Sequence, residues 1–266
     1  MQRLSDIKAM LAERGLRPRR RFGQNFLHDH NLLRRLVDAS GAGEGDLVLE
    51  VGPGTGTLTE TLLERGCEVI AVELDRDLAD LVADRVGDQI TLIRGDCLGG
   101  SRSLASPVVE AIGGRPFSLV ANLPYQAASP LMSELLLHHP NCAGQWITIQ
   151  QEVADRLTAM PGEPAWGPLG VIVRSMADVQ QIASLPPSCF WPAPKVRSAM
   201  VAVVPHSDRG EDPAGFAAFV TRLFTTRRKQ LGGVLGREVV QSVGVDPQWR
   251  CERLDIETLK RLYKAV

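Results

Sequence analysis

The sequence LVLEVGPGTG at residues 47–56 decides the fold. Its first half, Leu47–Val51, is mainly apolar and predicts a short buried strand. Gly52, Gly54 and Gly56 then predict a tight loop, and residues 57–65 have leucines at helical spacing. A strand, a glycine loop and a helix in this order predict an α/β unit in which a ligand can approach the loop backbone closely.

The same alternation of strand and helix continues along the chain. The further predicted elements are strands at 68–74, 89–94, 117–121 and 146–150 and helices at 76–86, 130–138 and 152–160. Residues 97–116 are rich in Gly, Ser and Pro and predict a loop with one helical turn near 108–112. This pattern predicts a parallel, doubly wound sheet that binds its ligands at the carboxyl ends of the strands.

Candidate ligand-binding residues follow the first four strands and therefore share that edge. The glycine loop follows the first strand, Glu73 ends the second and Asp96 ends the third. Glu73 is placed to accept hydrogen bonds from two ribose hydroxyls, and Asp96 can accept one from an adenine amino group. These residues predict a pocket for an adenosine-containing cofactor.

Asn122, Leu123, Pro124 and Tyr125 follow the fourth strand. Pro124 lacks an N–H and bends the chain off the sheet edge, so we expect carbonyls here that no strand ladder pairs. The Asn122 side-chain oxygen and these carbonyls can accept both protons of an exocyclic amine, and the Tyr125 ring can stack on the base. The quartet indicates an enzyme acting on adenine, although an ordinary exit from a strand into a turn remains an alternative.

The identity of the cofactor follows from the loop and the quartet together. A dinucleotide fingerprint has the pattern GxGxxG, whereas Thr57 stands where its third glycine would fall. A nicotinamide or other nucleotide site stays open on the loop alone. The adjacent amine-binding quartet favours S-adenosylmethionine, with its sulfonium near the loop and its methyl group directed toward Tyr125.

Composition bounds the other functions. The 266 residues, 44% of them hydrophobic, can bury a large core and a smaller second one, and 30 basic against 31 acidic residues exclude a uniformly basic protein. Two basic clusters stand out nevertheless: Arg14, Arg17, Arg19, Arg20 and Arg21 near the start, and Arg222, Arg227, Arg228 and Lys229 near the end. Each is a solvated face or a site for phosphate.

We expect a reduced, cytoplasmic protein without a metal. The five cysteines form no CxxC pair and have no histidine at ligand spacing. No apolar stretch reaches the length of a membrane span, and the first twenty residues lack the apolar core of a signal peptide. Leu4, Ile7, Met10 and Leu11 instead predict an amphipathic helix that is either packed or RNA-facing.

A second domain is predicted after residue 205. The apolar run 196–204 should return to the sheet, and residues 206–213 are polar with Gly and Pro, as a linker would be. Beyond it the periodicity is helical, with one apolar face formed by Phe216, Phe219, Val220, Leu223 and Phe224 and a final helix at 254–265. We therefore assign 1–205 to a catalytic domain with a basic N-terminal segment and 206–266 to a helical RNA-binding domain.

Seven strings carry a family resemblance. They are RRRFGQNFL (19–27), EVGPGTGTLT (50–59), VELD (72–75), NLPY (122–125), QEVADRLTA (151–159), FWPAPKVRSA (190–199) and FTTRRK (224–229). In this order and spacing, from about residue 14 to the C-terminus, the chain resembles the ribosomal RNA adenine dimethyltransferase family. The resemblance implies a Rossmann-like, S-adenosylmethionine-dependent methyltransferase fold with a small C-terminal helical domain.

The resemblance also implies roles for residues at the predicted pocket. The implied cofactor contacts are Asn25, Leu27, Gly52, Gly54, Glu73, Asp96 and Asn122. Asn122 with a carbonyl of Leu123 or Pro124 would hold the target amine, and Tyr125 with Phe190 would enclose a flipped base, although core packing beside Trp191 is an alternative for Phe190. The implied RNA contacts are Arg19, Arg20, Arg21, Arg222, Arg227, Arg228 and Lys229.

The function implied is dimethylation of two adjacent adenines near the 3′ end of small-subunit (16S) ribosomal RNA during ribosome biogenesis. We expect a monomer that acts on the small subunit or its precursor. The same chemistry on large-subunit RNA and a binding role in assembly or transcription remain alternatives.

The chain departs from the family pattern at several positions. Trp166 and Gly170 stand where Tyr and Ser are usual, Gln126 and Ala127 where Asn and Ile are frequent, and Gln230, Gly232 and Gly233 replace Thr, Arg and Asn. These substitutions spare every proposed cofactor contact but remove polar groups near the C-terminal basic cluster. They bear on RNA affinity, or on which adenines are chosen, rather than on catalysis.

Overall fold

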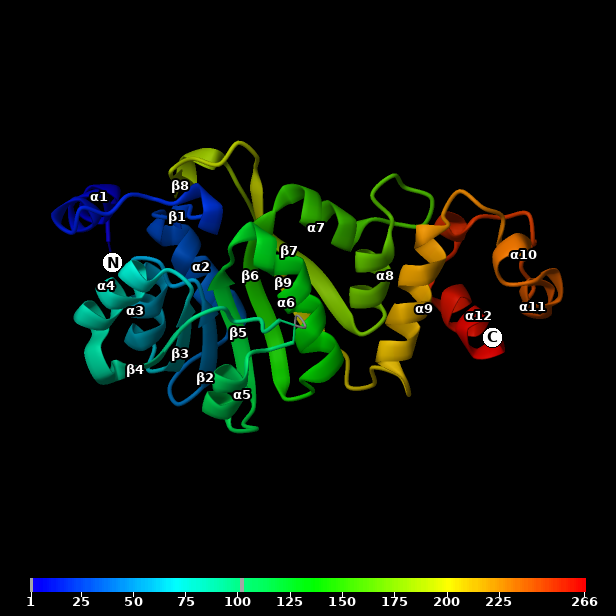
Figure 1. Ribbon diagram of the computed structural model, residues 1–266, viewed down its shortest axis with the longest axis horizontal. Coiled ribbons are helices and arrows are strands. Elements are labelled where there is room, and N and C mark those ends of the chain that lie inside the picture. Colours follow the sequence, from blue (N-terminus) through cyan, green and yellow to red (C-terminus); the bar gives the residue numbers. More distant parts are fainter. Residues whose placement is uncertain (1, 101–102) are drawn as a thin grey trace. The chain divides into compact units, whose positions relative to one another are not determined.

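The structure is a computed structural model that describes residues 2–100 and 103–266 (Figure 1). The chain forms two compact units, Met1–Gln151 with Gln180–Val204, and Glu152–Val179 with Pro205–Val266. The boundary at 204/205 lies one residue from the division drawn from the sequence. Residues 152–179, which that division placed in the first domain, belong to the second unit, because the chain leaves the first unit after the fifth strand of the sheet and later returns.

A seven-stranded sheet has the order β4-β3-β2-β5-β6-β9-β7. The strands are β2 Leu47–Val51, β3 Glu68–Glu73, β4 Ile90–Arg94, β5 Phe117–Asn122, β6 Cys142–Gln150, β7 Ala177–Leu185 and β9 Ser198–Pro205. Strands β4, β3, β2, β5 and β6 pair in parallel, for example Leu49 with Ile70 and Ala121 with Ile147. The predicted α/β class is confirmed.

The sheet is not wholly parallel, which corrects the prediction. Strand β9 does return to the sheet, but it pairs antiparallel with β6, with Ile147 opposite Val201. The chain reaches β9 from β7 without an intervening α-helix. Two neighbouring strands that run parallel need a long crossover between them, usually a helix. The connection without an α-helix therefore favours a β9 that runs opposite to its neighbour β7.

The helices of the first unit are α1 Leu4–Glu13, α2 His30–Ser40, α3 Thr57–Glu64, α4 Arg76–Val86, α5 Ser106–Ile112 and α6 Tyr125–His138. Helices α2 to α6 contact the sheet, whereas α1 packs Ile7 and Leu11 against α4. Val48, Val69 and Val120 pack with residues of α2 and α3 in one apolar cluster. The alternate residues Leu49 and Ile70 are also fully buried, as expected for a sheet covered on both faces.

Several predicted boundaries shift. Helix α6 begins at Tyr125, five residues before the predicted start, and Pro130 lies inside it. Strand β6 begins at Cys142 rather than at 146, because its pairing with β5 extends to Phe117. Helix α5 confirms the helical turn predicted near 108–112 and begins two residues earlier, at Ser106. The sequence did not predict α2, β7 or the two-stranded sheet of β1 Phe26–Leu27 and β8 Phe190–Trp191.

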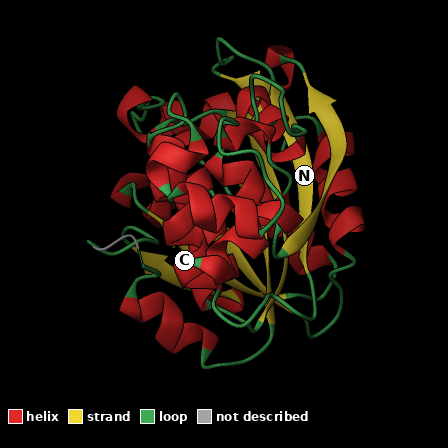
Figure 2. Ribbon diagram, turned by 90° about the vertical axis from the view of Figure 1, so that its right-hand side faces the viewer, coloured by secondary structure: helices red, strands yellow, loops and turns green. Residues whose placement is uncertain are grey.

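The second unit consists mainly of helices, as Figure 2 shows. They are α7 Gln151–Thr158, whose first residue belongs to the first unit, α8 Pro168–Arg174, α9 Pro213–Thr225, α10 Leu231–Val234, α11 Arg237–Ser242 and α12 Ile256–Ala265. The predicted apolar face of α9 is buried. Tyr263 of α12 packs its ring 5.8 Å from that of Phe216 and donates a hydrogen bond of 2.6 Å to Asp212. No helix among the described residues has both the length and the apolar character needed to cross a membrane.

Candidate active site

A cavity of about 360 Å³ opens at the carboxyl ends of the parallel strands in the first unit. Its volume lies within the range of small-molecule sites. Every predicted cofactor and base contact lines it: Asn25, Leu27, Gly52, Gly54, Glu73, Asp96, Asn122, Leu123, Pro124, Tyr125 and Phe190. Residues far apart in the sequence are therefore brought to one cavity.

The glycine loop is compressed between two other segments. Gly52 and Gly54 have φ values of +74° and +62°, which favour glycine. A Cβ on Gly54 would lie 2.9 Å from the Phe26 ring, and one on Gly52 would lie 3.2 Å from Pro124. Side chains at these positions would push away the N-terminal segment and the Asn122 quartet, both of which line the cavity.

Glu73 is buried at the end of β3 and holds the loop in place. Its carboxylate accepts hydrogen bonds from the backbone N–H of Gly54 at 3.1 Å and of Asp75 at 2.9 Å. Burial nevertheless raises the pKa of Glu73 to about 7, against the opposing effect of these N–H donors. A carboxylate oxygen has two lone pairs, so both oxygens can still accept ribose hydroxyls.

Glu50 is a second buried acid at the cavity and was not among the site residues predicted from the sequence. It accepts a hydrogen bond of 2.7 Å from the Thr59 hydroxyl, while its complete burial raises the pKa of its carboxyl to about 8. The signal was present, because a glutamate stands inside the otherwise apolar β2. A buried acid without a basic partner is kept neutral by its surroundings.

Asn122 is oriented by the N-terminal segment. Its Nδ2 donates a hydrogen bond of 3.0 Å to the Asn25 carbonyl. A carbonyl can only accept, so the amide nitrogen must face it, and Oδ1 is the atom left for a ligand donor. This is the orientation that an acceptor for an amine proton requires.

The backbone around Pro124 differs from the expectation in one respect. Pro124 is the N-cap of α6, and its carbonyl accepts a hydrogen bond of 2.9 Å from the Ala127 N–H. The first turn of α6 thus already uses one lone pair of the Pro124 carbonyl, which leaves a single lone pair for a ligand. Of the two predicted backbone acceptors, the Leu123 carbonyl is the better candidate.

Tyr125 and Phe190 lie in different surroundings. The half-buried Tyr125 shares a hydrogen bond of 2.9 Å between its hydroxyl and that of Ser198, and burial raises the pKa of the phenol. Ser198 is fully buried and was missed as a site residue, although it lies in the string FWPAPKVRSA. Phe190 pairs with Leu27 in the β1–β8 sheet and is 3% exposed, so it forms cavity wall and core at once.

Asp96 and the N-terminal basic cluster complete the edge of the cavity. Asp96 is exposed, and its Oδ1 accepts the Leu98 N–H at 3.0 Å. Arg19 forms ion pairs with Asp75 at 2.7 Å and with Asp77, while Arg21 lines the cavity and stacks over the Phe22 ring. The side chain of Arg20 lies outside the described residues.

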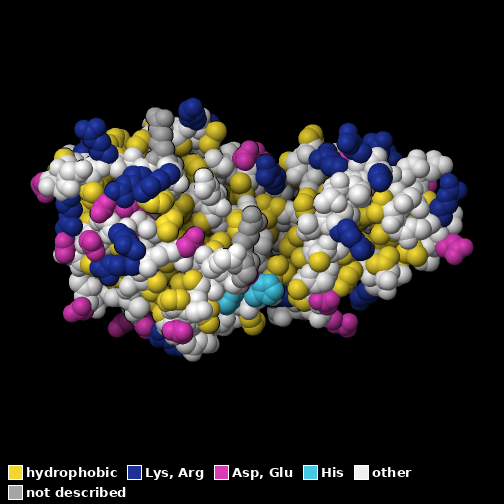
Figure 3. All heavy atoms as spheres, viewed as in Figure 1, with side chains coloured by type: hydrophobic (Ala, Val, Ile, Leu, Met, Phe, Trp, Pro, Cys, Tyr) yellow, Lys and Arg dark blue, Asp and Glu magenta, His cyan; other side chains and the backbone are white. Residues whose placement is uncertain are grey.

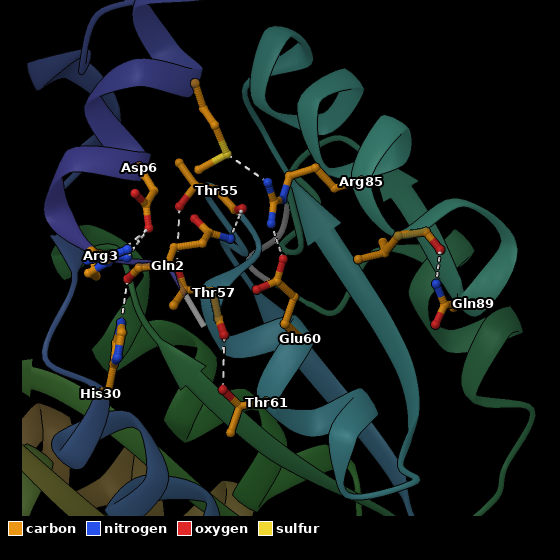
Figure 4. Close-up of polar contacts among 12 residues, drawn as sticks. Gln2, Arg3, Asp6, His30, Thr55, Thr57, Glu60, Thr61, Arg85 and Gln89 are labelled. Carbon is orange, nitrogen blue, oxygen red and sulfur yellow. Dashed lines mark hydrogen bonds and ion pairs between the residues drawn. The ribbon is translucent and has the colours of Figure 1, made fainter.

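The N-terminal helix is packed rather than RNA-facing on its apolar side, since Ile7 and Leu11 are buried. Just before this helix, Gln2 donates from Nε2 to the Thr55 carbonyl of the glycine loop at 2.8 Å (Figure 4). The Gln2 carbonyl is itself 2.5 Å from His30 Nε2. The start of the chain is thus fastened to the loop that shapes the cavity.

The C-terminal basic cluster lies in the second unit. Arg222, Arg227, Arg228 and Lys229 are exposed, and Arg227 pairs with Glu252 at 3.5 Å. Figure 3 shows Lys and Arg side chains gathered on the visible face of this unit. All five cysteines are buried and none forms a disulfide, and no cluster of potential metal ligands occurs among the described residues.

The fold and the cavity define an α/β protein of the class that binds a nucleoside cofactor at the carboxyl edge of its sheet. Comparison with known proteins narrows this class. Residues 15–266 match the family model described as ribosomal RNA adenine dimethylase. The chain belongs to this family, which confirms the resemblance seen in the sequence.

Individual relatives span nearly the whole chain. Proteins called ribosomal RNA small subunit methyltransferase A are 35% identical in Cutibacterium acnes, with 98% of this chain and 93% of the relative covered, and 38% identical in Pseudomonas aeruginosa, with 92% and 93% covered. A dimethyladenosine transferase from Plasmodium falciparum has a TM-score of 0.76 at 23% identity, covering 89% of this chain and 95% of its own. The 23S rRNA methyltransferase ErmE has a TM-score of 0.69 at 22% identity, covering 91% and 99%. The two structures support the Rossmann-like methyltransferase fold.

Proposed function

We propose that this protein transfers methyl groups from S-adenosylmethionine to the exocyclic amines of two adjacent adenines near the 3′ end of small-subunit ribosomal RNA. The observation that carries the proposal is the orientation of Asn122, whose Nδ2 is fixed on the Asn25 carbonyl at the edge of a nucleoside-sized cavity. The names of the bacterial relatives support the small subunit as the substrate particle.

The residues of the cavity fit the cofactor. The glycine loop, with no side chains at positions 52 and 54, leaves its backbone open to a ligand, Glu73 would accept the ribose hydroxyls, and the exposed Asp96 would accept an adenine amino group. When bound, S-adenosylmethionine supplies an electrophilic methyl group on its sulfonium. Asn25 and Leu27 would close the cavity from the N-terminal side.

The target amine is a weak nucleophile because its lone pair is delocalised into the purine ring. Asn122 Oδ1 and the Leu123 carbonyl would accept its two protons and favour the pyramidal nitrogen, whose lone pair is available for attack. Tyr125 would stack on the base, with Phe190 on its other face, and the Ser198 hydroxyl holds the Tyr125 hydroxyl in place. The alkylated nitrogen is more acidic and can release its proton to water, so no general base is required.

Basic side chains would hold the RNA backbone. Arg21 at the cavity and Arg222, Arg228 and Lys229 in the second unit are exposed and suited to phosphate. Arg19 and Arg227 would have to share their guanidinium groups with Asp75, Asp77 and Glu252. We propose a monomer acting in the cytoplasm, because a ribosomal particle is far larger than the enzyme and supplies the rest of the binding surface.

The test is to incubate the purified protein with methyl-labelled cofactor and with unmodified small or large ribosomal subunits. We expect label only in the small-subunit RNA, on two neighbouring adenines near its 3′ end. Label in the large-subunit RNA alone would show that the large subunit, and not the small subunit, is the substrate. Label in neither particle, with intact binding to the small subunit, would favour a role in assembly without methylation.

A further inference from the structure

Trp249 lies in the second unit and has no part in the methyl-transfer site. It is 40% exposed, and every other Phe, Tyr or Trp side chain among the described residues is buried or half-buried. Its neighbours on the turn are Pro247, Gln248 and Arg250, of which Gln248 and Arg250 are also exposed. A single exposed apolar residue is ordinary on a protein surface, so its surroundings decide whether it is part of a binding site.

The turn that carries Trp249 is held rigidly. The Trp249 N–H donates to the Asp246 carbonyl at 3.0 Å, and the Gln248 N–H donates to the Asp246 side chain at 2.8 Å. Such a turn, with Pro at its second position, has a fixed backbone. The Trp249 backbone is therefore placed before any ligand arrives.

This turn is also fastened beside the C-terminal basic cluster. The Leu231 N–H donates to the Trp249 carbonyl and the Gly232 N–H to the Pro247 carbonyl, both at 2.8 Å. A Cβ on Gly232 would lie 2.7 Å from the Pro247 Cβ, so glycine permits the close approach. Lys229 is two positions before Leu231, which places the cluster and the turn on adjoining segments.

The surroundings of Trp249 are cationic. The Arg253 guanidinium lies 5.5 Å from the centroid of the Trp249 ring. Arg228, Lys229, Arg250 and Arg253 are exposed, and no ion pair with an acidic residue is found for them among the described residues. The ring is therefore bordered by positive charges that suit the phosphates of a nucleic acid.

We propose that Trp249 stacks on an unpaired base of an RNA strand whose phosphates contact Arg228, Lys229 and Arg250. An aromatic face beside cations without acidic partners is the combination that binds single-stranded nucleic acid. The Arg253 guanidinium would contact the Trp249 ring through a cation–π interaction and add positive charge. The proposal rests on the proposed function in one point, that RNA is the substrate.

The test uses the full-length protein and a fluorescent, unstructured oligoribonucleotide of ten bases. Trp249→Ala should weaken binding by about 5- to 150-fold, the range found when one base-stacking aromatic is removed. Trp249→Phe should retain most of the affinity. Met160→Ala, which removes another exposed apolar side chain of the second unit, is the control and should have no effect.

Salt dependence separates stacking from charge. The plot of log affinity against log salt should keep its slope in Trp249→Ala, because no phosphate contact is lost. The double variant Arg228→Gln/Lys229→Gln should instead lower the magnitude of the slope by about 1.4, or 0.7 for each phosphate of a single strand. A reduced slope in Trp249→Ala would assign the loss to charge and overturn the stacking role.

Failure of this proposal can be told apart from failure of the proposed function. If the wild-type protein methylates small subunits but Trp249→Ala binds the oligonucleotide as tightly as wild type, stacking is wrong and the enzymatic proposal stands. If neither particle is methylated but Trp249→Ala still weakens oligonucleotide binding, the enzymatic proposal is wrong and the stacking proposal stands. A wild-type protein that does not bind the oligonucleotide also overturns the stacking proposal.

Discussion

In the first unit, the carboxyl groups of Glu50 and Glu73 are buried at the cavity and hydrogen bonded to Thr59 and to backbone N–H groups. In the second unit, Arg228 and Lys229 are exposed to solvent and have no acidic partner among the described residues. Because they are buried, the two carboxyl groups are sensitive to small changes in geometry and to pH. Because they are exposed, the two basic side chains tolerate changes in geometry, but their interactions are weakened by salt.

The largest effect should come from Asn122→Ala. Removing the oriented Oδ1 should lower kcat for methyl transfer by about 100- to 1,000-fold, as loss of a preorganised polar group commonly does, while cofactor affinity changes only modestly. Single-turnover assays and calorimetric titration measure the two quantities. Asn141→Ala is the matched control, because Asn141 also donates from Nδ2 to a carbonyl, that of Arg115, at 2.8 Å. Near-native transfer by Asn122→Ala would refute the amine-holding role.

Glu50→Gln should change stability in a pH-dependent way. Burial raises the pKa of Glu50 from 4.5 to about 8, so the folded protein holds a proton that the unfolded chain has lost between these values. The stability that Glu50 contributes is therefore complete below about pH 4.5 and falls as the pH rises toward 8. Without cofactor, Glu50→Gln should be more stable than wild type at pH 8 by on the order of 2–4 kcal/mol and near-equal at pH 5.

Denaturant unfolding at several pH values measures this difference. Glu64→Gln, which removes an exposed glutamate, should follow wild type throughout. A constant difference between Glu50→Gln and wild type across this range would contradict a neutral Glu50.

Glu73→Gln should weaken cofactor binding by roughly 10- to 100-fold, because one charged hydrogen-bond acceptor is lost. Since burial raises the pKa of Glu73 to about 7, its carboxylate forms as the pH passes through that value. Wild-type affinity for S-adenosylmethionine should rise between pH 6 and 8, and Glu73→Gln should show a flatter profile. Titration calorimetry would reject the ribose assignment if the variant bound as tightly as wild type.

The smallest effect concerns Ser198. Ser198→Ala removes the partner of the Tyr125 hydroxyl and should cost about 1 kcal/mol in folding free energy. It should raise KM for the RNA particle a few-fold with little change in kcat, because the tyrosine ring is less firmly placed. Tyr125→Phe breaks the same hydrogen bond. The double variant should therefore lose less folding free energy than the two single variants added together, and the difference is the coupling energy. Strict additivity would show that the bond positions nothing.

Prediction from sequence succeeded where one local signal was enough. Strand β2 and helix α4 have the predicted bounds, because fully buried parallel strands are continuous apolar runs and Asp75 caps α4. Strand β7 was missed because its exposed positions give it no apolar run. Helix α2 was missed although Asp29 and Gly41 are ordinary cap residues.

Sequence by itself determined that the glycine loop, Glu73, Asp96 and the residues 122–125 meet at the cavity, because the carboxyl ends of parallel strands share one edge. Asn25, Leu27 and Phe190 were placed there by the family resemblance. Only the tertiary structure decided the chemistry of each group: that Asn25 orients Asn122, that Ser198 holds Tyr125, that Arg19 is paired with Asp75, and that Glu50 is buried with Thr59. These partners are separated along the chain, and hydrogen bonding and burial depend on distance in space, which no local pattern encodes.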